Sequence, residues 1–126
     1  MRLYLAGPMR GYPDNNASGF TDAAARLRDN GYIVWSPHEN ELPLSDDPAR
    51  GEGAELRHFL ALDLPAVLDS DAVAVLNGWQ ASVGAQVETY TAFACAIPVH
   101  EYDQATGGLG DRVHRYEHPH ISRQPY

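Results

Sequence analysis

Short apolar runs alternate with segments of helical periodicity along most of the chain. The apolar runs are 2–6, 32–35, 71–76 and 97–101. Their length and unbroken apolar character predict strands that are buried on both faces. Apolar residues at helical spacing predict helices over about 20–29, 54–70 and 85–96, the second of them containing Pro65.

This alternation predicts an α/β fold with three layers, a Rossmann- or flavodoxin-like doubly wound parallel sheet with helices on both faces. Right-handed crossovers favour the strand order 2-1-3-4. No repeat, low-complexity block or Gly/Ser linker divides the chain, so residues 1–126 are interpreted as one domain. The tail from about residue 103 is rich in Gly, His and Pro; it is not assigned and could add a fifth strand.

The predicted strand order also gives a position for a ligand site. Strands 2–6 and 71–76 are neighbours whose following helices leave on opposite faces of the sheet. Ligands of open α/β sheets bind beside such a switch point. The loops that follow these two strands, Gly7–Asn16 and Asn77–Gly84, are therefore expected to line the site.

The charge of the chain narrows the class of ligand. Of 126 residues, 17 are acidic and nine are Lys or Arg, which gives a net charge of −8, and all nine are Arg. Such an acidic surface repels nucleic-acid backbones, so a polynucleotide is excluded as the main partner. No apolar run is long enough to span a membrane, the first residues are too short a run for a signal peptide, and a single Cys excludes an internal disulfide framework. A compact cytoplasmic protein that binds a small molecule is expected.

The first loop, Gly7-Pro8-Met9-Arg10-Gly11, combines small residues with a cation. Small residues let a backbone approach a ligand, the N–H groups of such a turn can hold an anion, and the Arg10 guanidinium suits phosphate or carboxylate. A plain Gly/Pro turn with a solvated Arg is the alternative. The loop matches neither the Walker pattern nor Gly-x-Gly-x-x-Gly, so ATPase and dinucleotide functions lose their main support.

The second loop leads into a helix through Ser82-x-Gly84-x-x-x-Glu88. A hydroxyl and a glycine at a helix start, where N–H groups and the helix dipole favour negative charge, predict an anion site. The helix face taken as apolar comprises Val87, Thr91 and Ala94. Glu88 is therefore expected beside that face, either as a functional carboxylate or as a residue stabilised by the dipole.

Two further residues carry polar groups into elements predicted to be buried. Asp63 falls on the core-facing stripe of its helix, where a carboxylate is costly unless it is paired or functional. That stripe comprises Leu56, Phe59, Leu60, Leu64 and Val67. Alternatively, the helix restarts near Pro65 and Asp63 merely caps it. Tyr4 lies in an aliphatic strand, and its hydroxyl either contacts Glu88 or is explained by packing alone.

Three pieces of the chain occur together in one order: Tyr4-Leu-Ala-Gly-Pro-Met-Arg-Gly11, Asp63-Leu64 followed by Ser70-Asp71, and Ser82 to Glu88. This combination resembles the nucleoside 2-deoxyribosyltransferase-like superfamily, over roughly residues 2–102. The resemblance is closer to its nucleoside 5′-monophosphate N-glycosidases, which include deoxynucleotide N-hydrolases and cytidylate N-glycosidases. Small phage and bacterial proteins of unassigned activity share the same opening.

The resemblance implies a role for each matching residue. Glu88 would be the nucleophile that attacks C1′ of the sugar, Asp63 would transfer a proton to the departing base or position the sugar, and Tyr4 would touch Glu88. The 5′-phosphate would be bound by Gly7 to Arg10, Ser82 and Gly84. No metal or cofactor is required, and the family implies a homodimer.

Two prolines depart from the family pattern. Pro8 stands where the deoxynucleotide hydrolases commonly have Ser, which removes a hydroxyl and an N–H donor, and Pro65 follows Asp63 unexpectedly. The expected function is hydrolysis of the N-glycosidic bond of a (deoxy)nucleoside 5′-monophosphate. The alternatives are a 2-deoxyribosyltransferase, which exchanges bases, and a nucleotide-binding module without turnover, which the two prolines favour.

Several other residues have both a functional and a structural interpretation. Trp79 and Tyr12 lie in the two site loops and could stack on a base or pack at a dimer contact. Cys95 is expected to be a core thiol, Gly107–Asp111 a flexible segment, and Glu39–Glu55 a solvated loop or a lid over the site. The cluster His114, His118 and His120 is expected to be a solvated or subunit-contacting tail rather than a metal site.

Overall fold

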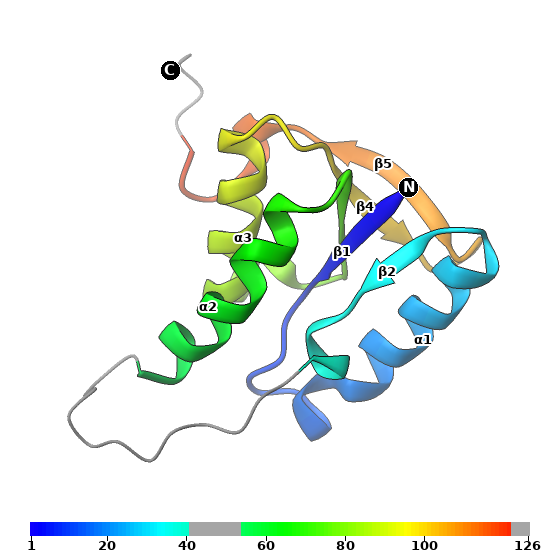
Figure 1. Cartoon of the computed structure of the whole chain (residues 1–126), viewed down its shortest axis with the longest axis horizontal. Coiled ribbons are helices and arrows are strands. Elements are labelled where there is room, and N and C mark those ends of the chain that lie inside the picture. The colour runs from blue at the N-terminus through cyan, green and yellow to red at the C-terminus, as the bar shows by residue number, and fades with distance from the viewer. Residues whose placement is uncertain (41–53, 122–126) are drawn as a thin grey trace.

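A computed structural model of the chain describes residues 1–40 and 54–121 (Figure 1). The strands are β1 (Arg2–Ala6), β2 (Ile33–Trp35), β3 (Ala72–Val75), β4 (Val99–Asp103) and β5 (Gly108–Val113). The helices are α1 (Ala17–Asp29), α2 (Ala54–Leu68) and α3 (Val83–Ala94), with short 3-10 turns η1 (Pro13–Asn16), η2 (Pro37–Glu39), η4 (Trp79–Ala81) and η5 (Arg115–Glu117). The predicted alternation of strands and helices is confirmed.

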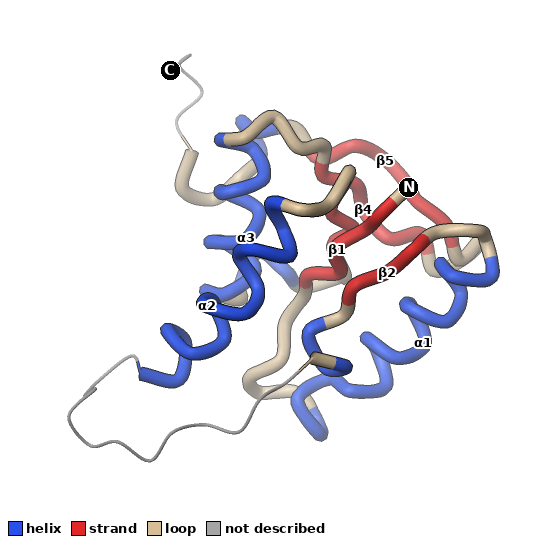
Figure 2. Tube along the Cα trace, viewed as in Figure 1, coloured by secondary structure: helices blue, strands red, loops and turns tan. Residues whose placement is uncertain are grey.

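The sheet has the order β2-β1-β3-β4-β5. Strands β2, β1, β3 and β4 pair in parallel, whereas β5 pairs antiparallel with β4. In Figures 1 and 2, α1 lies on one face of the sheet and α2 and α3 lie on the other. The predicted doubly wound order is therefore confirmed. The tail supplies a fifth strand at the edge, so the sheet is mostly rather than wholly parallel.

Side chains of the strands alternate between two cores, as the pleat requires. Leu3 and Leu5 of β1 face α1 and pack with Phe20 and Leu27. Tyr4 and Ala6 of the same strand face α2 and α3, in the core that also holds Val73, Val75, Val99, Val67 and Trp79. The α2/α3 face therefore receives the tyrosine hydroxyl of β1, which is the polar side chain that this strand buries.

The edge of the sheet opposite the predicted site is tied together by Asp71. Its carboxylate Oδ2 accepts the N–H of Arg2 at 2.7 Å, and its own N–H donates to the Arg2 carbonyl oxygen at 2.8 Å. This pair of bonds aligns the beginning of β1 with the beginning of β3, so Asp71 has a structural role.

Helix α2 runs without interruption from Ala54 to Leu68, with Pro65 inside it. The interpretation of Asp63 as the cap of a restarted helix is therefore wrong. Asp63 precedes Val67 by one turn, and both side chains are buried, whereas Leu56, Phe59, Leu60 and Leu64 are only half-buried. The stripe expected to face inward is thus most buried at its carboxylate and at Val67.

Helix α3 buries a different face from the one expected. Its buried residues are Ala85, Glu88, Thr89 and Ala92, which recur at helical spacing and face the sheet. Glu88 therefore lies on the buried face itself rather than beside it. Cys95, at the end of α3, is exposed, so its assignment as a core thiol is also wrong.

The tail after β4 is more ordered than its composition suggests. Gly107, with a φ of +74°, turns the chain into β5, and Gly108 to Asp111 belong to that strand, so the expectation of a flexible segment is wrong. After η5, His118 packs onto α3 with a 3% exposed side chain, and its Nε2 lies 2.8 Å from the Gln86 carbonyl oxygen. His118 is therefore not part of a solvated tail, whereas His114 and His120 are exposed.

Residues 41–53, most of the acidic segment expected to form a loop or lid, lie outside the described residues. Within residues 1–40 and 54–121, no group of three or more His, Cys, Asp or Glu side chains is arranged to hold a metal ion. No helix in these ranges combines the length and the apolar character needed to cross a bilayer.

Candidate active site

Three polar side chains from three elements meet between the sheet and the α2/α3 layer. Tyr4 comes from β1, Asp63 from α2 and Glu88 from α3, and their exposed fractions are 0%, 7% and 5%. The Tyr4 hydroxyl donates a hydrogen bond to Glu88 Oε2. Asp63 interacts with both partners through its charge and through hydrogen bonds. The structure thus brings together the three residues for which sequence reasoning proposed catalytic roles.

The position of Tyr4 is fixed by both neighbouring strands and by an aromatic contact. It pairs with Val73 of β3 on one side and with Trp35 of β2 on the other. Its ring stacks on the Trp35 ring, with centroids 5.4 Å apart and planes 18° apart. Sequence reasoning missed Trp35, although the parallel register of two strands predicted to be neighbours could have placed it opposite Tyr4.

Burial changes the acidity of this cluster. The pKa of Glu88 is raised from 4.5 to about 8. Desolvation by burial is the largest cause, the hydrogen bond from Tyr4 opposes it, and the negative charge of Asp63 adds to it. The pKa of Tyr4 is raised well above 10, first by desolvation and then by the charges of Glu88 and Asp63. At neutral pH the Tyr4 hydroxyl therefore keeps its proton, and Glu88 is mostly protonated.

The first loop lies directly against the end of β3. A Cβ atom on Gly7 would lie 2.8 Å from Leu76 Cβ, so only glycine fits between these two strand ends. Pro8 is buried, and its carbonyl oxygen accepts a hydrogen bond from Asn16 Nδ2 at 2.9 Å. Met9 packs against the α1 core. Gly11 has a φ of +88° with open space where a Cβ would stand, so it serves the turn.

Arg10 points to the beginning of α2. Its side chain is 84% exposed, and Nη2 lies 2.9 Å from Glu55 Oε2. An exposed ion pair of this kind contributes at most about 1 kcal/mol, so another anion can displace Glu55 at little cost. Arg10 therefore lies at the rim of the site with a weakly held partner, rather than in contact with the buried carboxylates.

Ser82 and Gly84 occupy the start of α3, on the helix that carries Glu88. Ser82 is the N-cap, and its Oγ accepts the N–H of Ala85 at 3.3 Å. Gly84 precedes Glu88 by four residues, so the two lie on one face of the helix, one turn apart. A Cβ on Gly84 would meet only Leu56 Cδ1, at 3.7 Å, which is an ordinary contact. The fold therefore does not require glycine at this position.

The two aromatic residues suggested for base stacking differ in accessibility. Tyr12 is 44% exposed, and its hydroxyl would lie 2.7 Å from a Cβ added to Gly78, so the two site loops touch here. Trp79 is 3% exposed and belongs to the α2/α3 core, where its ring lies 5.8 Å from the ring of His118. Little of the Trp79 ring face is open to a stacking base.

Comparison with protein families decides the membership of the chain. Residues 1–101 match the family described as "Domain of unknown function (DUF4406)". The chain belongs to DUF4406. The DUF4406 region thus contains β1 to β3, α1 to α3, and Tyr4, Asp63 and Glu88, and it ends within β4. Among curated proteins, none shows significant similarity to the chain.

Solved structures show which fold this DUF4406 chain adopts. The 2-deoxyribosyltransferase from the psychrotolerant bacterium Bacillus psychrosaccharolyticus superposes with a TM-score of 0.62 at 20% identity, over 90% of this chain and all of that one. A conserved protein from Enterococcus faecalis V583 gives a TM-score of 0.56 at 23% identity, over 83% of this chain and 65% of its own. The prediction of a 2-deoxyribosyltransferase-like fold is confirmed.

Gly7 and Gly84 provide a matched pair of substitutions. We expect Gly7→Ala to lower the free energy of unfolding by about 1–3 kcal/mol, because its Cβ would collide with Leu76. Gly84→Ala should leave stability unchanged or raise it by up to about 1 kcal/mol. Urea unfolding of both variants measures the difference. A large loss of stability in Gly84→Ala would show that the fold, and not a ligand, requires this glycine.

Proposed function

We propose that this protein hydrolyses the N-glycosidic bond of a (deoxy)nucleoside 5′-monophosphate and releases the free base and the sugar 5-phosphate. The buried cluster of Tyr4, Asp63 and Glu88 carries the proposal. Two carboxyl groups that interact at one site, one as nucleophile and one for proton transfer, are the groups that glycoside cleavage through a covalent intermediate requires.

The proposed reaction has two steps. In the first, a carboxylate oxygen of Glu88 bonds to C1′ while the bond from C1′ to the base nitrogen breaks; the base leaves with the electron pair and takes a proton from solvent water, while the ionised Asp63 positions the sugar. In the second, a water oxygen attacks C1′, the ester bond to Glu88 breaks, and Asp63 takes the water proton. The hydrogen bond from Tyr4 favours the ionised form of Glu88 before attack and orients its carboxylate.

The rim of the site supports a phosphorylated substrate. The first turn of α3 offers N–H groups and the positive end of the helix dipole, one turn from Glu88. Gly84 leaves space there for an anion to approach the backbone, and Arg10 can exchange Glu55 for a phosphate. Arg10 and the start of α3 place positive charge close to the proposed phosphate position. They can therefore attract a phosphate although the chain as a whole has a net charge of −8.

The test is incubation of the protein with a panel of nucleoside and deoxynucleoside 5′-monophosphates, followed by chromatography for free base. Release of base from at least one nucleotide, lost in Glu88→Ala, is the expected result. If no nucleotide is cleaved, or if Glu88→Ala cleaves as well as the parent, the proposed function is wrong. Tight binding without release of base would point to the nucleotide-binding module instead.

The pH profile of kcat/KM should rise toward pH 8, since the ionised form of Glu88 is the nucleophile. Tyr4→Phe removes the hydrogen bond that lowers the pKa of Glu88, so it should move this limb to higher pH. Asp63→Asn removes a charge that raises the same pKa, so its residual activity should show the limb at lower pH. Rates measured between about pH 5 and pH 10 report all three profiles.

Tyr32→Phe is the matched control for Tyr4→Phe, since Tyr32 is half-buried and packs on the α1 core, at the other face of the sheet. Tyr32→Phe should leave the rising limb of the kcat/KM profile at the pH of the parent. Shifts of Tyr4→Phe and Asp63→Asn in the same direction would contradict the opposing effects assigned to these two residues.

Arg10→Ala should raise the KM for nucleotides by about 10-fold or more, because a charge-assisted hydrogen bond to phosphate contributes about 1.5–3 kcal/mol. The KM for nucleosides, which lack the phosphate, should stay within about twofold. Arg2→Ala is the control, since Arg2 pairs with Asp69 at the opposite edge of the sheet. Equal losses for nucleotides and nucleosides would show that Arg10 does not recognise the phosphate.

Base exchange is the second candidate activity, and the structural similarity to a 2-deoxyribosyltransferase favours it. In that reaction the nitrogen of a second base, rather than water, attacks C1′ of the intermediate on Glu88. Addition of a second free base to the assay distinguishes the two, because a transferase forms a new nucleoside or nucleotide. We further propose that the protein acts in the cytoplasm and forms a homodimer. Sedimentation equilibrium measures the molecular mass in solution and so tests the homodimer.

A further inference from the structure

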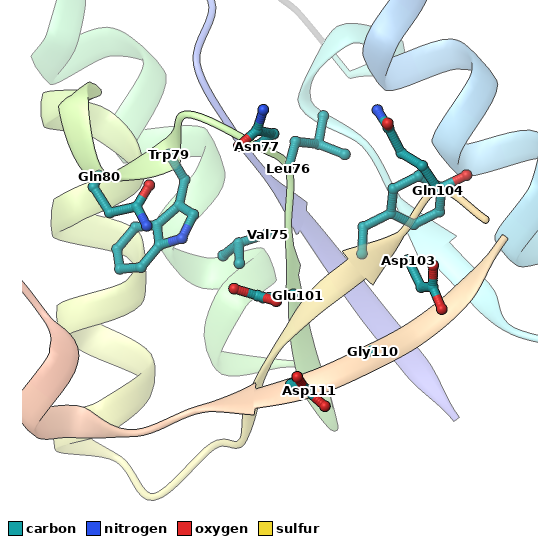
Figure 3. Close-up of a pocket in the computed structure, with 11 residues that line it drawn as sticks. Val75, Leu76, Asn77, Trp79, Gln80, Glu101, Asp103, Gln104, Gly110 and Asp111 are labelled. Atoms are coloured by element: carbon teal, nitrogen blue, oxygen red, sulfur yellow. The ribbon is translucent and has the colours of Figure 1, made fainter. Parts of the chain in front are cut away.

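A cavity separate from the cluster of Tyr4, Asp63 and Glu88 lies beyond the loop that follows β3. It has a volume of about 470 Å³ and opens where β3 and β4 end, with β5 and η4 as its other walls (Figure 3). Tyr4, Asp63 and Glu88 do not line it. It shares with the candidate active site Leu76, against which Gly7 packs, and the loop from Asn77 to Gln80. Its volume falls within the range of small-molecule sites.

Three carboxylates surround this cavity. Glu101 pairs with Val75 in the parallel ladder, so its side chain points to the α3 face of the sheet. Asp103 of β4 and Asp111 of β5 also line the cavity, and Asp103 Oδ1 accepts the N–H of Ala105 at 2.9 Å. No Arg is among the lining residues, and the chain contains no Lys. A ligand with a phosphate would be repelled here, whereas a ligand rich in N–H donors would be attracted.

Trp79 adds a directional donor to the wall. Its side chain is 3% exposed, and Figure 3 shows the indole nitrogen on the side of the ring that faces Glu101. Within the described part of the chain the indole N–H has no hydrogen-bond partner, and no fully buried side-chain N or O atom there lacks one. The indole nitrogen therefore reaches the cavity and requires an acceptor from whatever occupies it.

Amide side chains complete the polar lining. Asn77, Gln80 and Gln104 each present both donors and an acceptor. Val75 and Leu76 contribute apolar surface between these polar groups. The cavity thus offers several strong acceptors, one fixed donor, adaptable amides and an apolar wall, which is the complement of a nitrogen heterocycle with an exocyclic amine.

We propose that this cavity binds an unphosphorylated nitrogen heterocycle that carries an exocyclic amine, of the class that includes cytosine and adenine. The amine donates to Glu101 and Asp111, and a ring nitrogen or carbonyl oxygen accepts the indole N–H of Trp79. The site is separate from the Glu88 cluster, so the proposal holds whether or not the protein cleaves nucleotides.

The two tryptophans of the chain allow a direct test by NMR. The indole N–H resonance of Trp79 reports on the cavity, and that of Trp35, which stacks on Tyr4, reports on the candidate active site. Loss of one resonance in Trp79→Phe assigns both, or triple-resonance spectra do so if that variant does not fold. The titrations use the Glu88→Ala protein, in which turnover is not expected.

Cytosine should shift the Trp79 resonance saturably, and uracil, in which a carbonyl replaces the amine, should bind at least about tenfold more weakly. Cytidine 5′-monophosphate should shift Trp35 and leave Trp79 in place. Glu101→Gln and Asp111→Asn should each weaken the binding of cytosine by about fivefold or more, and Asp22→Asn on α1 should not.

Three results would overturn the proposal: a Trp79 resonance that does not move with cytosine or adenine, an equal shift with uracil, or a shift with spermidine in place of the heterocycles. The last would show that the carboxylates bind simple amines and that the indole N–H has no part. Failure of Trp35 to respond to any nucleotide would count against the proposed function alone.

Discussion

Glu88→Gln is expected to lower the rate of N-glycosidic bond cleavage by at least about 10³-fold while the protein stays folded. The amide has nearly the shape of the carboxyl group, so its oxygen can accept the Tyr4 hydroxyl and its NH₂ group can donate to Asp63. What the variant loses is the nucleophile, because an amide oxygen does not form the ester to C1′. Single-turnover assays with the nucleotide that the parent cleaves fastest measure the loss.

The matched control for this substitution is Asp22→Asn, which removes an exposed carboxylate from α1 on the opposite face of the sheet. Its rate should stay within about twofold of the parent. Circular dichroism and the unfolding midpoint establish that both variants are folded. A Glu88→Gln protein as fast as the parent would exclude Glu88 as the nucleophile and, with it, the covalent intermediate.

The first half of the fold could be predicted because its local signals agree with one another. The strand at 2–6 is apolar and ends at Gly7, which the structure requires at the close approach to Leu76. Phe20 and Leu27 lie on the buried face of α1, which ends at Asp29 with Asn30 as its C-cap, and Gly31 has a left-handed φ of +92°. In such elements hydrophobic periodicity, caps and turns all indicate the same structure.

Helix α3 could not be oriented from hydrophobicity, because its outer side is the more apolar one. The residues that face the sheet include Glu88 and Thr89, whereas Val83 and Tyr90 are 58% and 43% exposed. A helix that carries the polar groups of a site inward reverses the usual pattern. The same reversal explains why Cys95 was misplaced.

The tail was unpredictable for a different reason. Strand β5 contains Gly108 and Gly110 and has little apolar character, so its stability comes from antiparallel pairing with β4 rather than from its own sequence. His118 likewise gains its place from distant residues, since its ring nitrogen lies 3.1 Å from Thr89 Oγ1 on α3. Long-range pairing of this kind leaves no local pattern.

The buried part of the candidate site was predicted better than its exposed rim. The strand order predicts that Glu88 lies near the switch point, and the resemblance to the 2-deoxyribosyltransferase-like superfamily predicts that Tyr4 and Asp63 lie at the same site, where the structure buries all three. The rim depends on side-chain partners that spacing does not reveal. Arg10 pairs with Glu55, and Ser82 uses its hydroxyl to cap α3, so both meet a protein partner before any ligand.

Glu88→Gln is also expected to change how stability depends on pH. The pKa of Glu88 is about 8 in the folded protein and about 4.5 in the unfolded chain, because folding buries the carboxyl group. Between these values the folded state holds a proton that the unfolded state has released. The contribution of Glu88 to the free energy of unfolding is therefore fully present below pH 4.5. It is lost as the pH rises toward 8, by up to about 1.4 kcal/mol per pH unit.

Gln is neutral at every pH, so the variant lacks this loss. We expect parent and variant to unfold with similar free energies near pH 5, and the variant to be more stable by a few kcal/mol near pH 8. Urea unfolding of both proteins at several pH values between these limits measures the difference, in which the other titrating groups cancel. Asp63→Asn should lose less stability than the parent as the pH rises, since this substitution lowers the pKa of Glu88 in the folded protein. Parallel curves for parent and Glu88→Gln would mean that Glu88 ionises normally, and the assignment of a protonated carboxyl group at neutral pH would be wrong.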